Sequence, residues 1–85
     1  MIYVSLLPLS GAELVEWIAL RRVCGGGVAM VGGSWFDLGR LVPCYLPDTL
    51  DGLRRDGLIA LTEVDEWGLR RAAATLAGRA RYVEL

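Results

Sequence analysis

The chain has 85 residues, 54% of them hydrophobic, and a formal net charge of −1 at pH 7. It contains neither Lys nor His, which excludes a Walker phosphate-binding motif and a His-based acid–base centre. The near-neutral charge argues against strong, sequence-independent binding to nucleic acid. We therefore expect a non-catalytic protein without a cofactor, folded as a single domain over residues 1–85.

The apolar content is high for so short a chain. A domain of this size buries only about 60–65% of the surface that its unfolded chain exposes. At a mean hydropathy of +0.42, we expect a second copy or a protein partner to cover part of the remainder. No apolar run is long enough to span a membrane, and no signal peptide is visible, so we expect a cytoplasmic protein.

Cys24 and Cys44 are the only thiols. Two cysteines without His cannot supply the four ligands of a structural zinc site, so no metal is expected. A cysteine nucleophile would lack the usual His base. Both thiols are expected to be reduced and partly buried.

The first predicted helix begins after Ser10 and ends near Cys24. Ser10 and Glu13 form a capping box, and Leu9 and Leu14 occupy the two positions of a hydrophobic staple. Three glycines follow Cys24 and supply the C-cap.

Two short segments and a second helix are predicted in the first half of the chain. Residues 2–7 form a weak strand or an extended arm, and residues 28–31, "VAMV", form a brief buried strand fenced by glycines. Ser34 and Asp37 resemble a second capping pattern, which predicts a short helix that Pro43 stops.

The second half predicts a helix, a hairpin and a final helix. Pro47 suits the first turn of the helix and Gly57 its C-terminus. Residues 58–63 and 69–75 are strand-like runs joined by "VDEWG". The final helix carries one apolar stripe, which we predict to serve self-association: Leu76, Ala80 and Val83.

The run "TLDGLRRDGLIALTE" resembles the third helix and first wing strand of MarR-like and PadR-like regulators. "ATLAGRARYVEL" is similar to the exit of their second wing strand into a final helix. The resemblance implies a winged helix-turn-helix: an α+β, mostly α fold with a three-helix core, a C-terminal two-strand wing and a short final helix. In this family the third helix enters the major groove, and the wing touches the adjacent backbone or minor groove.

By this resemblance, the duplex-facing positions of the third helix are Asp48, Thr49, Asp51, Gly52 and Arg55. The two acids have the wrong sign for phosphates, so the face is equally consistent with a solvated acidic surface. The residues predicted to bind DNA are Thr49, Arg54, Arg55, Arg70 and Arg71. Arg79 and Arg81 would extend this basic rim or be ordinary solvated residues.

In the wing, Arg70 and Arg71 point to opposite faces of their strand, so only one easily reaches a given duplex. Alternatively they keep the hairpin solvated and pair with Asp65 or Glu66. Trp67 at the wing tip is predicted to contact a partner, the alternatives being that it folds back onto the domain or stacks on Arg70.

Two functional hypotheses follow from the sequence. The first is a small, homodimeric winged-helix protein that binds duplex DNA and regulates transcription or another DNA transaction. The second is a non-catalytic protein–protein interaction module on the same scaffold, which docks through Trp67 and its surplus apolar surface.

Overall fold

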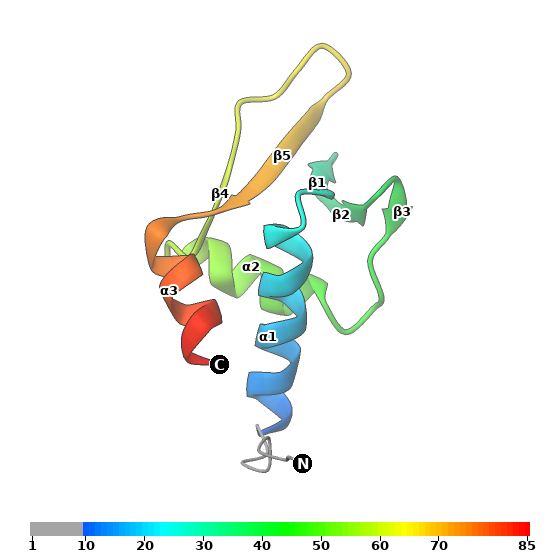
Figure 1. The fold of residues 1–85 in the computed structure, drawn as a ribbon. Helices are drawn as coiled ribbons and strands as arrows, with labels where there is room; N and C mark the ends of the chain where they lie inside the picture. The colour runs from blue at the N-terminus through cyan, green and yellow to red at the C-terminus, as the bar shows by residue number, and fades with distance from the viewer. Residues whose placement is uncertain (1–9) are drawn as a thin grey trace.

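The computed structural model describes residues 10–85, which form three helices and one five-stranded antiparallel sheet (Figure 1). The helices are α1 (Gly11–Cys24), α2 (Pro47–Arg55) and α3 (Leu76–Glu84). The strands are β1 (Val28–Val31), β2 (Ser34–Asp37), β3 (Arg40–Leu41), β4 (Ile59–Leu61) and β5 (Leu69–Ala74). The predicted α+β class is confirmed. The predicted arm at residues 2–7 and the staple residue Leu9 lie outside the described part of the chain.

The strand order is β3-β2-β1-β5-β4, so the two wing strands belong to a larger sheet. β1 pairs with β2 on one side and with β5 on the other, and this places Ala29 between Phe36 and Arg71. The sheet is therefore larger than the predicted two-strand wing. The β4–β5 hairpin, called the wing below, is part of this five-stranded sheet. The wing is continuous with the hairpins that precede α2.

The short helix predicted between Ser34 and Pro43 is wrong, because this segment forms β2 and β3. Gly32 and Gly33, with φ of 57° and 84°, form a tight turn that returns the chain antiparallel to β1. Pairing with β1 outweighs the local capping signal of Ser34. Within residues 10–85, no helix directly precedes α2 to make a helix-turn-helix with it.

The predicted ends of α1 and α2 are confirmed. The Ser10 hydroxyl accepts from the Glu13 backbone N–H at 3.1 Å, and the Glu13 carboxylate accepts from the Ser10 N–H at 3.1 Å. α2 starts at Pro47, and Gly57 follows its end with a left-handed φ of 80°.

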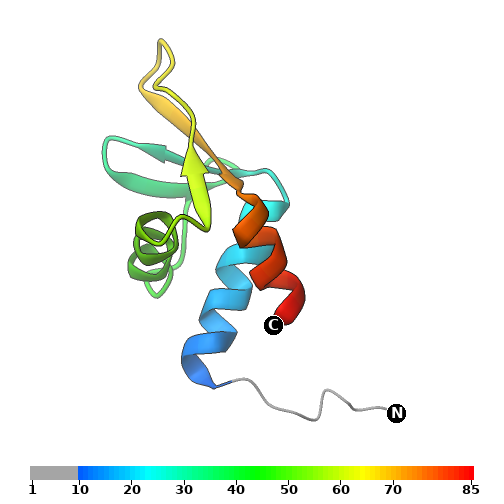
Figure 2. The ribbon, with the colours of Figure 1, turned by 90° about the vertical axis from the view of Figure 1, so that its left-hand side faces the viewer.

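One core lies between the helices and a single face of the sheet. In Figure 2 the helices lie below the sheet, and the wing points away from them. The side chains that fill this core are at most 7% exposed: Ala19, Leu20, Val23, Val28, Trp35, Val42, Leu46, Leu50, Leu53, Ile59 and Ala72. The three helices thus cover only one of the two sheet faces.

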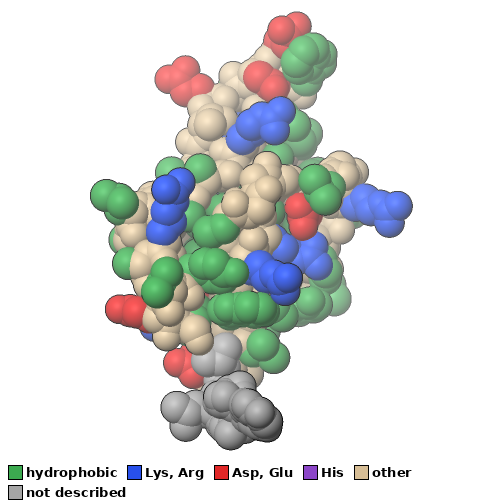
Figure 3. Space-filling model, in the orientation of Figure 1, with side chains coloured by type: hydrophobic (Ala, Val, Ile, Leu, Met, Phe, Trp, Pro, Cys, Tyr) green, Lys and Arg blue, Asp and Glu red, His purple; other side chains and the backbone are tan. Residues whose placement is uncertain are grey.

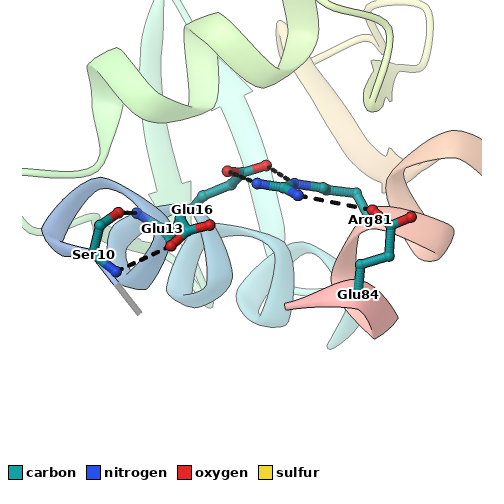
Figure 4. A network of polar contacts seen from close by, with 5 residues as sticks. All are labelled: Ser10, Glu13, Glu16, Arg81 and Glu84. Atoms are coloured by element: carbon teal, nitrogen blue, oxygen red, sulfur yellow. Dashed lines mark hydrogen bonds and ion pairs between the residues drawn. The ribbon is translucent and has the colours of Figure 1, made fainter. Parts of the chain in front are cut away.

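α3 is fastened to α1 by an ion pair (Figure 4). Arg81 donates through Nε and Nη2 to the Glu16 carboxylate at 2.8 and 3.0 Å, and Glu84 lies 3.7 Å from the same guanidinium. The hydrogen bond to Glu16, together with the charges of Glu16 and Glu84, raises the pKa of Arg81. Arg81 therefore holds α3 in place and is not part of a solvated basic rim.

Candidate functional site

α2 presents a face of mixed charge to solvent. Asp48, Arg54 and Arg55 are exposed, and Thr49 is half-buried. Asp51 is also exposed, but its carboxylate accepts a 2.8 Å hydrogen bond from the indole N–H of Trp35, whose side chain is buried. This hydrogen bond ties the Asp51 carboxylate to the core, which neither sequence interpretation of this helix face anticipated.

The two wing arginines point to opposite faces, as predicted. Arg70 is opposite Met30 in the sheet, and its Nε donates to the Thr62 carbonyl at 2.9 Å. Arg71 is opposite Ala29 and is exposed. Within residues 10–85 neither arginine forms an ion pair, so the predicted pairing with Asp65 or Glu66 is not present.

The wing tip is a fixed turn with an exposed indole. The Asp65 carboxylate accepts from the backbone N–H groups of Trp67 and Leu69, both at 2.9 Å. The Trp67 side chain is 77% exposed, so it does not fold back onto the domain. Figure 3 shows acidic and hydrophobic side chains together at this end of the molecule.

The two elements predicted to approach a duplex carry more acids than arginines. Residues 47–75 contain six acids (Asp48, Asp51, Asp56, Glu63, Asp65 and Glu66) and four arginines (Arg54, Arg55, Arg70 and Arg71), which leaves a net charge of −2. Duplex affinity comes largely from phosphates neutralised by Lys and Arg. The predicted DNA surface is therefore repelled, on balance, by a phosphate backbone.

The sheet face opposite the helices is apolar and hollowed. By strand register, Phe36, Ala29 and Arg71 form one row across it, and Val31 pairs with Leu69 beside them. They line a hollow of about 440 Å³, which is completed by Gly26 and Gly27 between α1 and β1 and by Leu38 and Gly39 between β2 and β3. Among residues 10–85, no helix residue lines this hollow, and Arg71 is the only charged side chain that does.

Leu38 stands at the rim of this hollow in an unfavourable conformation. It has a φ of 53°, precedes Gly39 in the turn between β2 and β3, and is 84% exposed. The left-handed region costs a residue with a Cβ about 1–2 kcal/mol. Such a turn favours Asn or Gly, so leucine is an unfavourable residue at this position.

The predicted apolar stripe of α3 lies on the surface. Leu76 and Val83 are 86% and 83% exposed, and Ala80 is exposed beside Arg79. The stripe is thus accessible, and its role in self-association stays a prediction.

Cys24 and Cys44 are free and exposed, so the predicted partial burial is wrong. Among residues 10–85, no group of three or more His, Cys, Asp or Glu side chains is placed to hold a metal ion. No helix in this same range is long and apolar enough to cross a membrane.

Comparison with known proteins identifies no similar protein. The chain matches no protein-family model, no curated protein and no solved structure. The resemblance to winged-helix regulators stays a prediction that rests on the quoted sequence runs.

The open sheet face was not predicted from the sequence. Its residues Phe36 and Leu38 fall in the segment predicted to be helical. The dipeptide Gly32–Gly33 was the signal that could have revealed it, because Gly-Gly between two short apolar runs is typical of a hairpin.

Proposed function

We propose that this protein is a non-catalytic protein-interaction module that docks a partner on its open sheet face and wing. The observation that supports it is the hollow of about 440 Å³ around Ala29, Phe36 and Leu69, which no helix within residues 10–85 lines. An antiparallel sheet with one face in water normally alternates apolar and polar residues. Here the side chains around Arg71 on the second face, Ala29, Val31, Phe36 and Leu69, are also apolar, which is typical of a surface that another protein covers.

The chemistry of the surface defines the partner. Of the side chains in the described part of the chain, Arg71 is the only charged one that lines the hollow. An apolar partner segment that carries a carboxylate would satisfy both features. Trp67 is 77% exposed at the tip of the hairpin whose strand β5 supplies Leu69 and Arg71 to the hollow, and it offers a large aromatic contact of the kind that often dominates binding energy.

A photo-crosslinking amino acid at Phe36 tests this function in the native cell. We expect it to trap one discrete protein species and the Arg71→Glu background to lose that product. The same crosslinker at Leu76, on the outer face of α3, serves as the matched control. Failure to trap any protein from Phe36, or identical products from both positions, would contradict the proposal.

The DNA-binding hypothesis has less support, because residues 47–75 carry a net charge of −2 and Arg70 is bound to the Thr62 carbonyl. Titration of a mixed-sequence duplex at low and high salt separates the two functions. An interaction module gives no binding at low salt. Salt-sensitive binding that the Arg70→Ala/Arg71→Ala variant weakens would favour DNA instead.

Replacing Leu38 separates folding from docking. We expect Leu38→Asn to raise the free energy of unfolding by about 1 kcal/mol, because Asn tolerates the left-handed conformation better. The same change removes an apolar side chain from the rim and should reduce crosslinking from Phe36. Urea denaturation and crosslink yield measure the two effects. A variant that gains stability and keeps full crosslinking would remove Leu38 from the docking surface.

A further inference from the structure

We infer that the partner on this surface is a second copy of the chain, so that two open sheet faces pack antiparallel about a two-fold axis near Leu69. The inference rests on the proposed function and names its partner. It follows from the order of chemical groups along the wing and β5.

The surface formed by the open sheet face and the wing is complementary to a second copy of itself related by a two-fold rotation. Glu66 and Trp67 stand at the wing end, Leu69 lies in the middle, and Arg71 lies two residues beyond it. A two-fold interface requires that each group meet its complement on the other copy. Rotation about Leu69 brings the acidic, aromatic tip of each copy toward the partner's Arg71, and it does so twice.

The dimensions suit this arrangement. The hairpin closes where the Asp65 N–H donates to the Leu69 carbonyl, so residues 66–68 form its tip on one side of Leu69 and Arg71 lies on the other. Packed sheets lie about 10 Å apart, a gap that Glu and Arg side chains from opposite sides can bridge. In both ribbon views the wing extends beyond the neighbouring strands, where its tip can reach a second copy (Figures 1 and 2).

Dimerisation would also give an ion-pair partner to Arg71 and cover an exposed apolar side chain. Arg71 has no ion-pair partner within residues 10–85, while Glu66 is exposed at the tip. A dimer would give Arg71 a carboxylate and the face of an indole, both favourable to a guanidinium. It would also cover Leu41, which is 67% exposed and opposite Phe36 in the sheet.

The α3 stripe is the rival surface, and its chemistry is less suitable. Arg79 lies between Leu76 and Val83 on the exposed side of the helix, and the nearby Glu84 already lies against Arg81. Two such stripes brought together around a two-fold axis would place like charges side by side. The sheet face has no such conflict.

Charge reversal tests the arrangement through a rescue that only this pairing allows. We expect sedimentation equilibrium from about 1 to 100 µM to show a wild-type dimer. Glu66→Arg and Arg71→Glu should each raise the dimer dissociation constant at least about tenfold. An equimolar mixture of the two variants should regain dimers, because each hetero-pair restores two opposite-charge contacts.

Arg79→Glu on α3 is the matched control and should leave the dimer intact. A wild-type monomer at the highest concentration would overturn the inference, as would a mixture that fails to associate. So would a dimer that dissociates with Arg79→Glu and survives Arg71→Glu. If the protein is a monomer but still crosslinks to another protein from Phe36, only the inference that the partner is a second copy is overturned. If the protein is a monomer and gives no crosslink, the proposed function is overturned as well.

Discussion

Gly78→Ala is expected to destabilise the domain more than any other single change of a glycine in α2 or α3. A Cβ at Gly78 would collide with the backbone carbonyl of Leu58, which is fixed by a 3.0 Å bond from the Thr75 N–H. Because the obstacle is backbone, we expect a loss of about 1–3 kcal/mol in the free energy of unfolding. In a domain of this size each kcal/mol lowers the melting temperature by about 4–8 °C.

Gly52→Ala provides the matched control. The nearest atom to a Cβ at Gly52 is the end of the Arg55 guanidinium at 3.3 Å, which can move aside. In the middle of α2, alanine should raise the free energy of unfolding by about 0.5–1 kcal/mol. In urea denaturation, the change in the free energy of unfolding is expected to be negative for Gly78→Ala and positive for Gly52→Ala. Equal changes would contradict the close approach of Gly78 to the Leu58 carbonyl.

The contact at Gly78 also bears on the interaction surface. The Thr75 hydroxyl lies 2.7 Å from the Gly57 carbonyl, 3.1 Å from that of Leu58, and accepts from the Gly78 N–H at 3.1 Å. These bonds join the two ends of the β4–β5 hairpin at its base. The base of the hairpin that carries Trp67 is therefore held between the start of α3 and the turn that joins α2 to β4.

The second half of the fold could be predicted because its local signals agree with its tertiary contacts. Pro47 and Gly57 bound α2, and Thr75 caps α3 through its hydroxyl. The first half could not be predicted in the same way. The run Ser34–Asp37 satisfies a capping pattern and a strand equally well, and the decision comes from pairing with β1.

The candidate site was predictable only in part. The sequence placed Trp67 at a hairpin tip and set Arg70 and Arg71 on opposite faces, because these follow from local geometry. The open face depends on which side of the sheet the helices cover. A continuous apolar run such as residues 28–31 predicts a strand buried on both faces, and here only one face is covered by helices.

Asp51→Ala is expected to lower the free energy of unfolding by about 1–3 kcal/mol. The substitution leaves the indole N–H of Trp35 without its carboxylate, and that side chain is only 2% exposed. Asp48→Ala, which removes an exposed acid from the same helix, should change stability by no more than about 0.5 kcal/mol.

A double-mutant cycle with Trp35→Phe isolates the pair. Trp35→Phe removes the indole N–H that donates to Asp51, so in that background Asp51→Ala breaks no hydrogen bond with residue 35. The loss of unfolding free energy in the double variant should therefore be smaller than the sum of the two single losses by about 0.5–3 kcal/mol. Measurable coupling would mean that one of the acids on α2 is held by the core. The negative charge that opposes a duplex would then be built into the fold, and a partner would have to bind elsewhere on the molecule. Additive losses, with Asp51→Ala no worse than Asp48→Ala, would instead leave α2 free to carry charge for a ligand of its own.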